Sequence, residues 1–157
     1  MKTRFFMFIA LTTMLVSCGG PQTEEPTQTD MRDKFVGKYA YEATGTVLVD
    51  LGAVRYNIPL NETGAFSISK AGDKDQVILV GYNDTIQAKV SGDQLILESN
   101  VINTQYNSIA LQLTFSYGQA TLIGKQLAWE SDVTAYATYS FFAATGNGTV
   151  SVIATKQ

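Results

Sequence analysis

The chain has 157 residues, no histidine, one cysteine and a formal net charge of −3. The absence of histidine excludes Ser-His and Cys-His nucleophile systems, and a single cysteine excludes an internal disulfide and a site built from several thiolates. The acidic balance makes the chain a poor partner for nucleic acid, so we expect no nucleic-acid binding.

The first 17 residues have the organisation of a secretory signal. Lys2 and Arg4 give a short positive region, and residues 5–16 (FFMFIALTTMLV) form an uncharged apolar run. This run is too short to span a bilayer, which takes about 20 residues, but it matches the apolar part of a signal peptide. We therefore expect residues 1–17 to be a signal peptide.

The only cysteine follows directly after this run. Leu15-Val16-Ser17-Cys18 resembles the lipobox of bacterial lipoproteins, in which an aliphatic residue and two smaller ones precede the cysteine that is acylated. The resemblance implies cleavage before Cys18, lipidation of Cys18 and attachment to a membrane through the lipid anchor. One acyl chain binds a membrane only marginally, so stable anchoring needs the several chains that lipoproteins carry. An ordinary signal peptide with a chance cysteine is the alternative.

Residues 18–30 are expected to be the lipidated cysteine and a flexible tether. The segment GGPQTEEPTQTD has no apolar residue and contains two prolines, a composition typical of disordered chain. Glycines after the cysteine, with no aspartate, resemble lipoproteins of the outer membrane of Gram-negative bacteria. Whether the domain faces the periplasm or the cell surface stays open, since Glu24-Glu25 could belong to a surface-export signal.

Residues 31–157 are expected to form one domain. Apolar and polar residues alternate along most of it, with the two-residue period of β-strands. The expected strands are 35–51, 64–70, 76–82, 85–91, 94–99, 108–116, 119–123, 126–141 and 147–156. Gly45 is expected to bend the first strand, and residues 52–63 to be an edge segment or loop. A short helical turn at residues 30–34 is expected to plug one end.

Four expected hairpin turns give the strands a common inward face. The turns are Asn83-Asp84, Gly92-Asp93, Tyr117-Gly118 and Gly124-Lys125. They pair Leu79 with Ala88, Val90 with Leu95, Phe115 with Ala120, and Leu122 with Leu127. A register slip of one residue would place each apolar set in water. We predict an all-β fold, an antiparallel meander of about eight to nine strands that closes into a barrel and hides its edges.

The start of the first strand carries a family resemblance. Phe35-Val36-Gly37-Lys38-Tyr39 resembles the Gly-x-Trp opening of the lipocalins and wider calycins, with Tyr39 in the place of tryptophan. The closing segment GTVSVIATKQ, after an all-β meander, is similar to small calycin-like lipoproteins of Gram-negative bacteria. The resemblance implies a calycin-like β-barrel over residues 31–157.

No arrangement of residues indicates catalysis. Glu130 and Asp132 share one face, as the carboxylates of a glycosidase do, but the alternation points that face outward. Asp73 and Asp75 are a conceivable calcium pair, yet they lie between strands, where turn chemistry accounts for them. We expect no enzyme, no cofactor and no metal site.

Aromatic side chains on the inward phase define a candidate ligand site. An eight-stranded barrel can hold one small ligand or be filled by its own side chains. We expect a binding module for a small apolar ligand, with ligand-binding residues Tyr39, Tyr41, Phe115, Ala120 and Trp129. Ala120 is expected to stand opposite Trp129 and leave room for a guest. The alternative is an envelope protein with a filled barrel that binds a protein or polysaccharide through its loops and outer face.

Overall fold

The computed structural model describes residues 29–50, 52, 54–81, 84–116 and 118–157. This part of the chain forms eleven strands, and their pairings are antiparallel. The strands are β1 (Gly37–Asp50), β2 (Arg55–Pro59), β3 (Glu62–Lys70), β4 (Gln76–Val80), β5 (Thr85–Ser91), β6 (Gln94–Leu97), β7 (Asn100–Tyr106), β8 (Ile109–Phe115), β9 (Gly118–Ile123), β10 (Gln126–Tyr139) and β11 (Phe142–Lys156). No helix long and apolar enough to cross a membrane occurs among these residues.

Eight of the strands close into a barrel. Their order around it is β1, β3, β4, β5, β6, β9, β10 and β11, and β11 pairs with β1 as well as with β10. Because the last strand returns to the first, this ring has no free edge. The structure confirms the predicted all-β antiparallel barrel, as a meander interrupted by two excursions, β2 and β7–β8.

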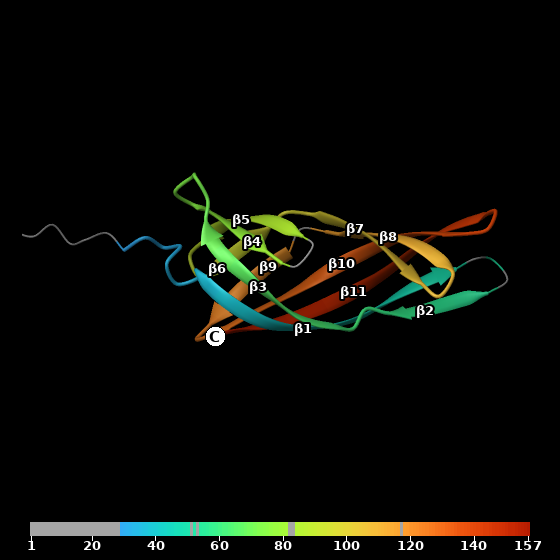
Figure 1. Cartoon of the computed structure of the whole chain (residues 1–157), viewed down its shortest axis with the longest axis horizontal. Coiled ribbons are helices and arrows are strands. Elements are labelled where there is room, and N and C mark those ends of the chain that lie inside the picture. The colour runs from blue at the N-terminus through green and yellow to red at the C-terminus, as the bar shows by residue number, and fades with distance from the viewer. Residues whose placement is uncertain (1–28, 51, 53, 82–83, 117) are drawn as a thin grey trace, which may run out of the picture.

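Three long strands extend beyond the barrel. β1, β10 and β11 have 14, 14 and 15 residues and run along the molecule (Figure 1). β1 pairs with β3 over Gly37–Ala43 and then with β2 over Thr46–Asp50, so Gly45 lies where the neighbour changes. β10 pairs with β9 over Gln126–Ala128 and with β8 over Val133–Thr138. We call the part that contains β3, β4, β5, β6 and β9 the barrel half, and the part that contains β2, β7 and β8 the distal half. The strands β1, β10 and β11 run through both.

Each half has its own core. The core of the barrel half contains Phe35, Tyr39, Ile68, Val77, Leu79, Ala88, Val90, Leu95, Leu97, Ala120, Leu127 and Ala154. The core of the distal half contains Val47, Val49, Ile58, Ile109, Leu111, Leu113, Val133, Ala135, Ala137, Val150 and Val152. Tyr41 and Trp129 are partly buried and pack against both cores, so they mark the junction between the halves.

The N-terminal segment closes one end of the barrel. Phe35 is fully buried in the core, and its carbonyl accepts a hydrogen bond of 2.8 Å from the Tyr39 hydroxyl. We call this the closed end, made of residues 30–38, 70–76, 89–94, 123–126 and 155–157. The expected plug is therefore present, but residues 31–35 form hydrogen-bonded turns. The Arg32 carbonyl accepts hydrogen bonds from the Phe35 and Val36 amides, at 2.9 and 3.2 Å, and the chain enters β1 directly afterwards at Gly37.

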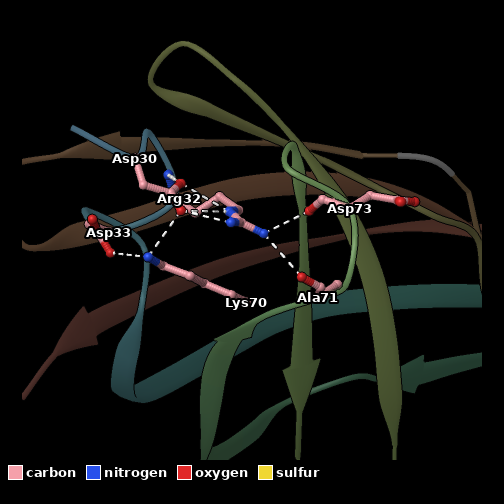
Figure 2. Close-up of polar contacts among 6 residues, drawn as sticks. All are labelled: Asp30, Arg32, Asp33, Lys70, Ala71 and Asp73. Carbon is pink, nitrogen blue, oxygen red and sulfur yellow. Dashed lines mark hydrogen bonds and ion pairs between the residues drawn. The ribbon is translucent and has the colours of Figure 1, made fainter. Parts of the chain in front are cut away.

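Arg32 ties this segment to the connection between β3 and β4 (Figure 2). Its guanidinium donates to the Asp30 carboxylate and to the carbonyls of Ala71 and Asp73, at 3.0 and 2.7 Å. The Lys70 ammonium lies 3.0 Å from Asp30 and 2.6 Å from Asp33. Hydrogen bonds from Arg32 and Lys70 hold the pKa of Asp30 well below its usual range.

Two of the expected hairpins are confirmed in register. Val90 pairs with Leu95 across Gly92, and Leu122 pairs with Leu127 across Gly124. The two glycines have φ angles of 57° and 63°, the left-handed conformation that glycine adopts without strain.

The hairpin expected between Phe115 and Ala120 is wrong. Phe115 pairs with Val133, and Ala120 pairs with Leu95. β8 and β9 both run antiparallel to β10, one after the other along its edge, so they run in the same direction and cannot form a hairpin. Tyr117 of the expected turn lies outside the described residues.

The register expected between β4 and β5 is wrong by two positions. Leu79 pairs with Ile86, and Ala88 pairs with Val77. Their connection is four residues long, and the Gly81 amide donates to the Asp84 carbonyl at 2.9 Å. A shift of two positions keeps each side chain on its face of the sheet, which is why the predicted core survives the error.

Two strands and two turns were not among those expected from the sequence. β2 lies in the segment expected to be an edge or loop, and it pairs with β1. β7 was missed, and it joins β8 through a turn in which Asn107 has a φ angle of 54°. β10 and β11 meet in a tight hairpin with Ser140 at a φ angle of 53°, so the last strand begins at Phe142.

Candidate functional site

A cavity of about 1010 Å³ lies where the two halves meet. Its wall combines Leu79 and Leu97 of the barrel core with Leu111 and Leu113 of the distal core. We call it the junction cavity. Cavities that bind small molecules usually measure about 300–1,000 Å³ and have mainly apolar walls, so its size is sufficient for a ligand.

The mouth of the junction cavity lies between two unpaired strand edges. Residues 100–106, the whole of β7, line one side, and residues 58–64, at the corner between β2 and β3, line the other. Among the described strands β7 pairs with β8 alone and β2 with β1 alone. No backbone ladder therefore joins these two edges, and the distal half stays open on this side.

Connected aromatic side chains form part of the wall. The ring of Phe66 lies 5.9 Å from that of Tyr41 and 6.3 Å from that of Trp129, centroid to centroid, with an interplanar angle of 72° to the indole. Offset and edge-on arrangements of this kind stabilise aromatic pairs. Tyr39 stacks on Phe66 at 5.3 Å. Because Tyr39 is fully buried, it supports the wall from behind.

Three of the five predicted ligand-binding residues line the junction cavity: Tyr41, Phe115 and Trp129. Tyr39 does not belong to the lining. Ala120 is also absent from the lining, because it is fully buried in the barrel core opposite Leu95. The hydrogen-bonded register of β9 and β10 ends at Thr121 and Ala128, one position short of the expected pair of Ala120 and Trp129. Cys18 lies outside the described residues.

The site expected from the sequence omitted three sets of lining residues: Phe66, Ser131 and the residues of β7. Phe66 joins the aromatic side chains, and the inward phase of β3 was the signal for it. Ser131 is the buried polar side chain among the described residues, 6% exposed, and it lines the cavity. Ile102 and Tyr106 were missed with β7, whose polar residues hide their alternation.

The charged groups of the lining are all acidic. Glu62, Asp84 and Glu98 are carboxylates, and the described lining holds no lysine or arginine. The Tyr41 hydroxyl donates a 2.9 Å hydrogen bond to the Glu62 carboxylate. Burial raises the pKa of Tyr41 to about 12, with further contributions from that bond and from the charges of Glu62 and Asp84. Tyr41 is therefore a neutral donor at physiological pH.

The sequence has no close relative among the proteins compared. No protein-family model matches the chain, and no curated protein matches it significantly. Among solved structures it is similar to a crystal structure of the ywiB protein from Bacillus subtilis. The identity is 10%, the likeness covers 80% of this chain and 98% of that chain, and the TM-score is 0.33. A likeness of this extent carries no argument about function.

The polar residues singled out for chemistry lie outside the junction cavity. Glu130 and Asp132 are exposed on the outer face of β10, and Asp75 forms an ion pair of 3.0 Å with Lys89. Within the described residues, no group of three or more acidic, histidine or cysteine side chains is placed to hold a metal ion. A wall of leucine and aromatic side chains interspersed with polar ones, including the Ser131 hydroxyl and the Tyr41 donor, is compatible with reversible binding.

A second, more open hollow of about 630 Å³ lies at the distal tip. Tyr136 and Phe142 line it from the hairpin of β10 and β11. Tyr139 and Phe141 of the same hairpin are also exposed, Phe141 at 99% of its surface. We call these four residues the aromatic tip.

Proposed function

We propose that the chain is a lipid-anchored protein of the cell envelope that binds a small apolar ligand in its β-barrel fold. The junction cavity is the observation that supports ligand binding, because Tyr41, Phe115 and Trp129 line about 1010 Å³ of space beside an open mouth. The anchor is supported by the lipobox-like segment that ends at Cys18 and by the apolar run before it. By resemblance, the membrane is the outer membrane of a Gram-negative cell.

Fluorescence tests this proposal, because Trp129 is the only tryptophan and lines the cavity. The full-length Cys18→Ser chain, which cannot be acylated there, is titrated with the neutral apolar probe N-phenyl-1-naphthylamine. We expect saturable probe fluorescence with energy transfer from Trp129. No saturable signal up to the solubility limit of the probe contradicts the proposal.

Two alanine-to-leucine variants separate the cavity from the surface. Ala43 lines the junction cavity, whereas Ala110 of β8 is exposed on the outer face. Ala43→Leu fills part of the cavity and should weaken probe binding about tenfold, which is about 1.4 kcal/mol. Ala110→Leu should leave it unchanged. Equal affinity in the two variants would place the probe elsewhere. Ala120, which was expected to leave room for a guest, does not line the cavity and is not a suitable site for this substitution.

The aromatic tip favours a second candidate function, contact with an envelope protein or polysaccharide. Single exposed apolar residues are common, but Tyr136, Tyr139, Phe141 and Phe142 lie together on one hairpin, and such clusters mark contact surfaces. Aromatic rings also stack on sugars. Retention of the protein by purified peptidoglycan, lost in the Phe141→Ala and Phe142→Ala double variant, supports this function. Equal retention of the double variant removes it.

A further inference from the structure

The charge around the mouth of the junction cavity is negative and uncompensated. Glu62 lies at the start of β3, Asp84 before β5 and Glu98 after β6. None of the three forms an ion pair with a basic residue among the pairs present in the described chain. Asp84 is only half-exposed, so its charge is screened by water less than that of a fully exposed residue.

The basic side chains of the described residues lie away from the mouth. The closed end carries eight basic and five acidic residues, whereas the rest of the described chain carries one basic residue, Arg55, and seven acidic ones. Arg55 is paired with Asp50 at 2.9 Å and does not line the cavity. The field at the mouth therefore attracts cations and repels anions.

The aromatic side chains of the wall favour a cationic ligand independently of the carboxylates. The faces of tryptophan and tyrosine rings attract cations, and clusters of such rings recognise quaternary ammonium groups. Tyr41, Phe66 and Trp129 form such a cluster on the wall, and Tyr41 is joined directly to Glu62 at the rim. A cationic group at the mouth would thus lie close to both the carboxylates and the aromatic cluster, while leucines accept an apolar tail deeper in.

We propose that the ligand of the junction cavity is a cationic amphiphile, with an ammonium head held near Glu62 and Asp84 and an apolar tail between the two cores. This inference rests on the proposed ligand-binding function and names the class of ligand for the same cavity. A fatty acid is disfavoured, because its carboxylate would face Glu62, Asp84 and Glu98 with no basic residue in the described lining.

Three ligands with the same eight-carbon tail test the proposal: octyltrimethylammonium, 1-octanol and octanoate. Each is titrated into the full-length Cys18→Ser chain at neutral pH and low salt, and Trp129 emission is followed. We expect the ammonium ligand to bind about tenfold more tightly than octanoate, with 1-octanol between them. Added salt should reduce this difference, because it screens charges at the mouth.

The double variant Glu62→Gln and Asp84→Asn assigns the preference to these carboxylates. Glutamine keeps an acceptor for the Tyr41 hydroxyl, so the affinity for 1-octanol should stay unchanged and reports an intact cavity. The tenfold preference for ammonium should fall to threefold or less. The control double variant Glu130→Gln and Asp132→Asn, on the outer face of β10, removes the same two charges outside the cavity lining and should keep the preference.

The outcomes separate the two proposals. The proposal of a cationic ligand is overturned if octanoate binds as tightly as octyltrimethylammonium, or if the preference persists in the double variant. In either case, binding of 1-octanol still supports the proposed function. No change in Trp129 emission with any of the three ligands overturns both.

Discussion

Replacing Phe35 with alanine should destabilise the fold more than almost any other single truncation. The Phe35 ring is 0% exposed at the closed end of the barrel, where it packs against the core from the segment that precedes β1. Its carbonyl bond to the Tyr39 hydroxyl belongs to the backbone and survives the substitution. The loss is therefore one of packing, with no orphaned polar group added.

The magnitude follows from comparable truncations. Removing a fully buried phenylalanine ring costs about 3–5 kcal/mol of unfolding free energy, through lost burial and the cavity that remains. For a domain of this size we expect the Tm to fall by about 10–20 °C. Urea denaturation followed by far-UV circular dichroism measures the free energy by linear extrapolation.

Phe141→Ala is the matched control, since the same atoms are removed from a residue that is 99% exposed. It should change the unfolding free energy by no more than about 0.5 kcal/mol. A loss below about 1 kcal/mol for Phe35→Ala, or equal losses for the two variants, would refute the argument that this ring closes the barrel.

Three further predictions concern the turns, the closed end and the anchor. Gly92→Val and Gly124→Val should each lower the unfolding free energy by about 1–2 kcal/mol, because they force a β-branched residue to a positive φ. Ser91→Val, at an exposed strand position, should leave it nearly unchanged. Urea denaturation measures the three values, and unchanged stability in the glycine variants would contradict the turn geometry. The lowered pKa of Asp30 means that its carboxylate stabilises the fold fully above its ordinary pKa of about 3.9 and that this stabilisation is lost as the pH falls below it. The Tm of the Asp30→Asn variant should therefore depend less on pH between neutral and acid, and parallel curves would speak against the ion-pair cluster. Mass spectrometry of protein from its native host should find an acylated Cys18 at the mature amino terminus, and an unmodified thiol there would exclude the anchor.

The hairpins at Gly92 and Gly124 were predictable from the sequence because their signals are local, but the same kind of signal at Gly118 predicted a hairpin that does not form. Gly92 and Gly124 mark two turns, and the alternating residues beside them fix the register within a few positions. The turns at Asn107 and Ser140 lack glycine, so one strand was missed and another was started late. Pairings between distant segments, such as β6 with β9 and β8 with β10, have no local signal.

The sequence predicted which side chains of the candidate site face inward, but not which of them are buried in a core and which line the cavity. Alternation shows that Tyr39 and Tyr41 share the inward face of β1, yet one lies beneath the packed barrel core and the other at the junction cavity. Both residues pair with β3, but Tyr41 lies two positions nearer the point where β1 exchanges β3 for β2, and that point depends on tertiary pairing. The acidic residues at the cavity mouth could not be predicted as a group either, since Glu62, Asp84 and Glu98 lie at the ends of three different strands that only the tertiary fold brings together.

The position of β11 means that the barrel cannot close before the end of the chain is available. β11 pairs with both β1 and β10, and Lys156 at its end donates a hydrogen bond to the carbonyl of Lys34, 122 positions earlier. A chain synthesised from its amino terminus therefore exposes the edges of β1 and β10 until β11 emerges, and neither core is complete before then. Closure over so large a sequence separation is slow. The unfolded interval suits a polypeptide whose first residues predict export across a membrane.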